Sequence, residues 1–305
     1  MTLTDTHCHL DLNKFDSDRE AVIERAIQAG VERILIPGLN VTSSQAAVKL
    51  AGSHPMLYAA VGIHPTEAGT WNASTRNELR LLAIPHPNPS PREAPPKGAG
   101  RGARGEGKVV AIGEIGLDYY WDSAPHDLQK KVLKEQLDLA GALQLPVIIH
   151  FREKIDAPDG DCASDLMKIL EEWVNRLRDG KGPLAERPGV LHSFSGSTQT
   201  ARWAIGLNFF IGVTGPVTYR KERQELVAAL PLERLLIETD APFLAPSPLR
   251  PSPTGRGDGV RVRNEPAYVR LIADKIASLH SCDITKVATV TSENALRLFA
   301  WKEPD

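Results

Sequence analysis

The chain has 305 residues, of which 42% are hydrophobic and 24% are charged, and its formal net charge is −2. This composition is that of an ordinary globular protein and excludes collagen-like, fibrous and wholly disordered chains. No apolar run approaches the ~18 residues of a membrane span, and the charge balance gives no support for a protein that coats nucleic acid.

Short apolar runs rich in Val, Ile and Leu alternate with amphipathic stretches along the chain. Expected strands cover residues 3–7, 33–36, 57–63, 109–113, 146–149, 189–191, 207–212 and 235–238. Apolar residues at three-to-four spacing predict helices within residues 16–30 and over 127–145, 164–177, 198–204, 221–230, 266–279 and 284–299. Eight strands alternating with helices predict a parallel α/β fold, either a (β/α)8 TIM barrel with extra C-terminal helices or a doubly wound open sheet.

Two Pro/Gly-rich segments interrupt this pattern. Residues 85–107 contain six Pro and five Gly, and residues 246–259 contain four Pro and three Gly. Such segments cannot bury a core, so we expect poorly ordered insertions into a single domain spanning residues 1–305. The second insertion precedes Arg263 and brings arginines near the expected catalytic mouth, where they could contact phosphates or obstruct the site.

The cysteines and the N-terminus predict a cytoplasmic protein. Cys8, Cys162 and Cys282 are an odd number and form no Cys-x-x-Cys pair, which argues for a reducing compartment. The first residues lack the basic and apolar regions of a secretory signal.

Reactive side chains gather at the C-terminal ends of the expected strands. They are His7, His9, His64, Glu114, His150, His192 and Asp240, with Glu114 ending the fourth strand and Asp240 following the eighth. Barrel enzymes draw their catalytic groups from these strand ends. The closed barrel is therefore favoured, because the first and last strands are neighbours only if the sheet closes.

Six of these residues form a candidate metal-ligand set: His7, His9, Glu114, His150, His192 and Asp240. Each histidine alone could be a satisfied core residue, and a carboxylate at the end of a buried strand is costly unless a cation or an ion-pair partner compensates it. With two histidines nearby, a metal is the better compensator. Imidazole and carboxylate donors without a thiolate suit Zn, Mn, Fe, Ni or Mg. Six donors exceed the needs of one four-coordinate ion, so two divalent ions are expected, with Glu114 as the bridge.

These motifs, in this order, resemble the TatD family of metal-dependent deoxyribonucleases in the amidohydrolase superfamily. The matching elements are Asp5-Thr-His7-Cys-His9-Leu-Asp11, Gly62-Ile-His64-Pro65, Gly113-Glu114-Ile-Gly-Leu-Asp118, His150-Phe-Arg152-Glu153, His192-Ser-Phe-Ser-Gly196, Glu238-Thr-Asp240-Ala-Pro242 and Arg263-Asn264-Glu265-Pro266. The resemblance implies a TIM barrel and 3′→5′ exonuclease action on DNA. It also implies two divalent ions (Mg, Mn or Zn), one held by His7, His9, Glu114 and Asp240 and the other by Glu114, His150 and His192.

Within this set, Asp240 is the candidate for orienting or deprotonating the attacking water, and Glu114 shares the catalytic assignment as the bridge. His64 and Arg152 are candidates for holding the substrate phosphate, because a guanidinium fork suits its oxygens. DNA is the expected partner, and neither a membrane nor an obligate protein partner is implied.

Two other functions remain open. The same metal cage could serve a small-molecule amidohydrolase such as a lactonase or amide hydrolase, because a fold and its ligands do not determine the substrate. A non-catalytic binding protein is less favoured, because no ligand is missing.

Overall fold

The computed structural model describes residues 1–84, 108–121, 123–155, 157–249 and 262–301. The expected insertion at 85–107 lies outside the described residues, as does the part of the second insertion from residue 250 onward. Within the described ranges, no helix combines the length and the apolar character needed to cross a membrane.

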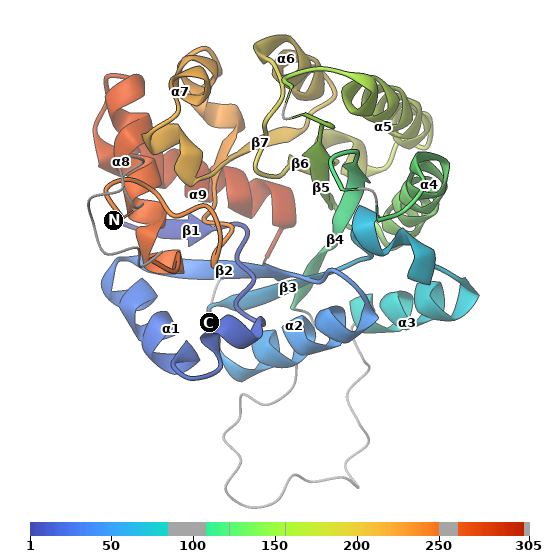
Figure 1. Cartoon of the computed structure of the whole chain (residues 1–305), viewed down its shortest axis with the longest axis horizontal. Coiled ribbons are helices and arrows are strands. Elements are labelled where there is room, and N and C mark those ends of the chain that lie inside the picture. Colours follow the sequence, from blue (N-terminus) through green and yellow to red (C-terminus); the bar gives the residue numbers. More distant parts are fainter. Residues whose placement is uncertain (85–107, 122, 156, 250–261, 302–305) are drawn as a thin grey trace, which may run out of the picture.

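Eight parallel strands form one sheet at the centre of the molecule, in the order β1 to β8 (Figure 1). The strands are β1 (Leu3–Asp5), β2 (Val31–Pro37), β3 (Leu57–Val61), β4 (Val109–Asp118), β5 (Val147–Arg152), β6 (Gly189–Leu191), β7 (Phe210–Val213) and β8 (Leu235–Ile237). The segment after β8 hydrogen-bonds to the segment after β1. The amide of Asp240 donates to the carbonyl of His7 at 2.8 Å, and that of His9 donates to the carbonyl of Ala241 at 2.8 Å. The predicted (β/α)8 barrel is therefore confirmed over the open doubly wound sheet.

Helices surround the strands on the outside of the barrel (Figure 1). The α-helices of the described ranges are α1 (Arg19–Gln28), α2 (Val41–Ser53), α3 (Ala73–Ala83), α4 (His126–Leu143), α5 (Asp161–Asp179), α6 (Thr198–Gly206), α7 (Lys221–Ala228), α8 (Val269–Leu279) and α9 (Ile284–Phe299). Short 3₁₀ helices occur at η1 (Asn13–Phe15), η2 (Pro65–Thr70), η3 (Pro183–Glu186), η4 (Gly215–Thr218), η5 (Leu232–Arg234) and η6 (Pro266–Tyr268).

Helices α2 and α3 were not among the predicted elements. The buried face of α2 consists of the small residues Ser44, Ala47 and Ala51, so its apolar stripe is weak. Its start is instead marked by Asn40, whose side chain accepts the amide of Ser43 in a reciprocal capping box. Asn72 opens α3 in the same way. Capping, rather than hydrophobic periodicity, was the available signal for both helices.

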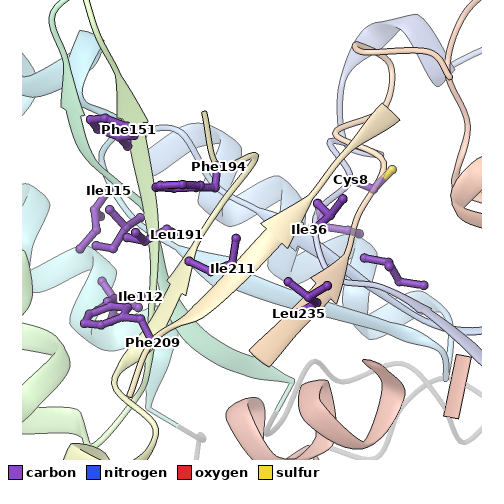
Figure 2. Packing of buried hydrophobic residues seen from close by; sticks show 14 of the residues in the cluster. Cys8, Ile36, Ile112, Ile115, Phe151, Leu191, Phe194, Phe209, Ile211 and Leu235 are labelled. Carbon is purple, nitrogen blue, oxygen red and sulfur yellow. The ribbon is translucent and has the colours of Figure 1, made fainter. Parts of the chain in front are cut away.

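The fourth and fifth strands are longer than predicted, and Glu114 is therefore not at the end of its strand. β4 continues to Asp118 and β5 to Arg152, and the two remain paired over residues 115–118 and 149–152. We call this paired extension the β4–β5 ribbon. Its outward side chains stay buried, with Ile115 of β4 and Phe151 of β5 in the hydrophobic layer shown in Figure 2. That burial supplies the free energy that carries the pairing past the barrel rim.

The barrel interior is filled from its N-terminal end. Strands β2 to β8 contribute one or two residues each to a separate buried cluster, which contains Leu35, Tyr58, Ala60, Val110, Ala111, Ile148, Val190, Phe210 and Leu236. The end of α9 completes this cluster with Leu298, Phe299 and Trp301. Strand side chains alternate in direction, so the residues two positions after Ile148 and Val190 also face the interior, one layer nearer the C-terminal mouth.

Candidate metal centre

Four predicted ligands converge at the mouth of the barrel. Nε2 of His7 lies 3.3 Å from Nε2 of His9 and 3.3 Å from Oε2 of Glu114. Nε2 of His9 lies 3.5 Å from Oδ1 of Asp240 and 3.7 Å from Oε2 of Glu114, and the His7–Asp240 distance is 3.9 Å. A four-coordinate ion with ligand distances of about 2.0–2.2 Å sets its ligand atoms roughly 3.3–3.6 Å apart. These donors therefore fit a divalent cation held between them.

Glu114 connects this cluster to a second group of donors. Its other oxygen, Oε1, lies 2.8 Å from Nδ1 of His150 and 3.7 Å from Nε2 of His64. Nε2 of His150 lies 2.9 Å from Oδ2 of Asp118. His64, Asp118 and His150 each offer a ligand atom within 4.8 Å of the others. The two oxygens of Glu114 thus face two different sets of donors, which is the arrangement that a bridging carboxylate needs.

His192 lies on the side of the first cluster. Its ring stacks on that of His7 with 3.4 Å between ring centres, and its Nε2 lies 3.8 Å from Oδ1 of Asp240. Its ligand atom groups with those of His7 and Glu114 within 4.8 Å. The resemblance implies that Glu114, His150 and His192 hold the second ion. In the structure His150 and His192 approach Glu114 from two different sides, His192 beside His7 and His150 beside His64 and Asp118.

The carboxylates and imidazoles of the cluster shift each other's pKa. Burial alone would raise the pKa of Glu114, but the neighbouring His7 and the hydrogen bond from His150 hold it well below its usual range. Burial would lower the pKa of His150, but Asp118 and Glu114 raise it to about 9. Without a metal, protons on the imidazoles must therefore balance buried carboxylates. Metal ions would take over that role and release those protons.

His64 differs from the other histidines of the cavity. Burial, followed by the nearby His150, lowers its pKa to about 3. Its Nδ1 caps η2 by accepting the amide of Thr66 at 3.3 Å. His64 is therefore a neutral imidazole whose Nε2 points toward Glu114.

Asp240 is held in an unusual backbone conformation by buried side chains. Its φ angle is +53°, in the left-handed region that few non-glycine residues adopt. On one side, Asp5 accepts the amide of Thr239 at 2.9 Å and its hydroxyl at 2.6 Å. On the other side, Nδ2 of Asn264 donates to the carbonyls of Thr239 at 2.8 Å and Phe243 at 2.6 Å. Strained backbone of this kind is characteristic of functional sites.

The cluster opens into a cavity of about 700 Å³, which is within the range of small-molecule and substrate sites. His9, Glu114, His150, His192 and Asp240 line it. The two predicted phosphate ligands, His64 and Arg152, line the same cavity.

Two buried carboxylates of the site, Asp118 and Glu238, had no predicted role. Asp118 follows Glu114 by four residues on one strand, so strand alternation places both on the same face. Oε1 of Glu238 lies 2.9 Å from Nδ1 of His192 without hydrogen-bond alignment. Glu238 precedes Asp240 by two residues, and this spacing could have identified it.

Arg263 is engaged elsewhere and does not face the cavity's ligands. Its guanidinium donates to both oxygens of Asp18, at 2.8 and 2.7 Å, and to Glu265 at 2.9 Å. It also lies over the ring of Phe15, 4.5 Å from its centre. Arg263 therefore joins the loop after β8 to the segment before α1 and takes neither of the two roles left open for the arginines of the second insertion.

Comparison with known proteins gives one consistent result. The family model described as TatD related DNase matches residues 4–300. An uncharacterized metal-dependent hydrolase, YabD, from Bacillus subtilis is 37% identical over 97% of this chain and 98% of its own length. The 3′-5′ ssDNA/RNA exonuclease TatD of Salmonella typhimurium is 33% identical over the same shares. Among solved structures, the TatD homologue YjjV from Escherichia coli superposes with a TM-score of 0.76 at 30% identity, over 98% of both chains.

Proposed function

The chain belongs to the TatD-related DNase family of metal-dependent hydrolases, and we propose that it hydrolyses phosphodiester bonds of DNA, removing nucleotides from the 3′ end of single strands. The observation that carries this proposal is the convergence of six imidazole and carboxylate donors, five of which line one open cavity. Relatives that are about one-third identical over nearly the whole chain are named 3′-5′ exonucleases, and this supports the proposed direction of digestion.

The donor set suits two divalent ions, Mg²⁺, Mn²⁺ or Zn²⁺. His7, His9, Glu114 and Asp240 would hold one ion. The resemblance assigns Glu114, His150 and His192 to the other, but His192 lies with the first group, so His150, Glu114 and the neighbouring Asp118 are the donors placed for the second ion. Two such ions supply the hydroxide-generating and charge-neutralising chemistry that phosphodiester hydrolysis requires.

Asp240 is the residue best placed to handle the proton of the attacking water. Its side chain is 15% exposed at the cavity, whereas those of His7 and Glu114 are 0% and 3% exposed. Burial would raise the pKa of Asp240, but His9 and His192 lower it, so the carboxylate is ionised and able to accept a proton. Its fixed left-handed backbone keeps that oxygen in one position.

His64 and Arg152 would hold the phosphate that is attacked. Arg152 brings a permanent positive charge to the cavity wall from the end of β5. His64 is neutral, so it would act as a hydrogen-bond donor to a phosphate oxygen and not as a charge.

The proposal is tested by incubating the purified protein with labelled single-stranded DNA, duplex DNA and RNA under each divalent ion. A 5′-labelled single strand should shorten progressively from its other end, a 3′-labelled strand should release a labelled mononucleotide, and EDTA should abolish both reactions. Hydrolysis of lactones or amides without any action on the oligonucleotides would instead support the small-molecule amidohydrolase.

A further inference from the structure

Two exposed aromatic side chains stand at the mouth of the cavity. Tyr120 and Trp121 follow directly after β4, and they are 39% and 54% exposed. Their rings meet edge to face, with 4.9 Å between ring centres. Trp121 lines the same cavity as the metal-ligand cluster. Exposed aromatic groups beside a polar cavity are characteristic of ligand sites.

The turn that carries these rings is held rigidly by the protein itself. Oδ1 of Asp118 accepts the amides of Tyr120 at 3.0 Å and Trp121 at 2.9 Å. The buried side chain of Gln129 accepts the amide of Asp118 at 2.8 Å and donates to its carbonyl at 2.9 Å. A ligand would therefore meet a preformed surface and would not have to order the turn on binding.

The same aspartate joins this turn to the metal-ligand cluster. Its second oxygen, Oδ2, lies 2.9 Å from Nε2 of His150, whose Nδ1 lies 2.8 Å from Glu114. Contacts through Asp118 and His150 thus connect the backbone that carries the aromatic rings to the carboxylate of Glu114. A group bound on the rings would therefore be a near neighbour of the reacting phosphate.

Arg152 adds positive charge to the aromatic surface. It lies opposite Asp118 in the backbone pairing of the β4–β5 ribbon. Its guanidinium carbon lies 3.8 Å from the ring centre of Tyr120 and 5.7 Å from that of Trp121. Aromatic faces combined with a guanidinium are the recurring surface for single-stranded nucleic acids, in which bases stack and the cation faces the backbone.

We propose that Trp121, Tyr120 and Arg152 form a stacking subsite that holds a nucleobase of the single-stranded substrate beside the metal cluster. The indole of Trp121 takes the base, Tyr120 packs against the edge of the indole, and Arg152 faces the phosphate backbone of the strand. The subsite selects single strands, because the bases of a duplex are already stacked and paired. This inference rests on the proposed function for its choice of ligand.

The test compares binding of two strands by the metal-loaded protein. One is a short fluorescent single strand whose 3′-terminal linkages are phosphorothioates that resist hydrolysis, and the other is the same strand with base-free spacers at its 3′-terminal positions. Kd is measured by fluorescence anisotropy for the parent, Trp121→Ala and Trp121→Phe. Leu81→Ala on α3, where the leucine is 48% exposed, controls for loss of an exposed apolar side chain.

Trp121→Ala should weaken binding of the normal strand by about 5- to 150-fold, the range that base–aromatic stacking gives. It should leave binding of the base-free strand unchanged, while Trp121→Phe retains most of the affinity and Leu81→Ala behaves as the parent. An equal loss on both strands, no loss on either, or no binding of the normal strand by the parent would overturn the subsite. Trp121-dependent binding without any hydrolysis of unmodified DNA would refute the proposed function alone. Hydrolysis with binding unaffected by Trp121→Ala would refute the subsite alone.

Discussion

The amide of Asn264 supports the position of Asp240, and its removal should therefore reduce both stability and turnover. Asn264 is fully buried. Replacing it with alanine leaves the carbonyls of Thr239 and Phe243 without the donor that reaches them at 2.8 and 2.6 Å. A buried polar group that loses its partner costs about 1–3 kcal/mol. Two such groups, partly relieved by water entering the site, should lower the free energy of unfolding by about 2–4 kcal/mol.

The same substitution frees the strained segment that carries Asp240. A displacement near 1 Å in a catalytic group can cost about 100-fold in rate, so kcat on a single-stranded oligonucleotide should fall by that order while the fold survives.

Urea unfolding followed by circular dichroism gives the stability change, and release of labelled mononucleotide gives the turnover. Asn208→Gly is the matched control, because Asn208 also donates its amide to a carbonyl, at 3.2 Å to Ala185, and has a φ of +71° that glycine tolerates. This control should lose about 1 kcal/mol of unfolding free energy and should keep the parent's turnover. If Asn264→Ala unfolds at the parent's urea concentration and turns over at the parent's rate, the supporting role of the amide is refuted.

Four further outcomes are expected. Gly116→Ala should lower the free energy of unfolding, measured by urea titration, by about 2 kcal/mol or more. The reason is that φ at Gly116 is +148° and the added Cβ would overlap a backbone oxygen of β5. Gly69→Ala, whose Cβ would meet open space, should be nearly neutral. Asp240→Asn should cut turnover by about 100-fold or more in a protein that still unfolds cooperatively in urea, and retained turnover would remove its role. Adding Mn²⁺ to protein stripped with EDTA should raise Tm progressively, by an amount equivalent to about 2.7 kcal/mol at 100 times Kd, and a Tm that is independent of the ion would contradict the metal site. Arg263→Ala should lower the free energy of unfolding near neutral pH. Arg263 lowers the pKa of Asp18 from 3.8 to about 2, so the stabilisation from this pair is present above pH 3.8 and is lost as the carboxylate takes up its proton. The difference in unfolding free energy between the variant and the parent should therefore narrow as pH falls from about 4 to about 2. A constant difference across that range would argue against the pair.

The architecture and the main donors followed from local patterns. The eight apolar runs each became a strand, because parallel strands buried on both faces need continuous apolar sequence. The convergence of His7 with Asp240, from opposite ends of the chain, was predicted because barrel strands present their C-terminal ends to one mouth. Backbone closure between these two residues bears this out.

What local patterns could not supply depends on contacts between distant segments. The β4–β5 ribbon exists because Ile115 and Phe151 find buried neighbours above the rim, and no window of sequence contains both strands. The partner of Arg263 could not be predicted for the same reason, since Asp18 lies 245 positions away. The α2 helix was missed because its buried residues are small, and its interaction with the sheet depends on close approach and not on apolar area.

The closure of β8 onto the segment after β1 has a consequence for how the protein matures in the cell. The histidines near the N-terminus emerge from the ribosome long before Asp240, and the amide of Asn264 that secures Asp240 emerges later still. A nascent chain therefore lacks the complete first donor group of His7, His9, Glu114 and Asp240 until translation is nearly complete. Metal loading should then coincide with the final closure step, so a polypeptide truncated before residue 264 should be deficient in bound metal even where its earlier strands have paired.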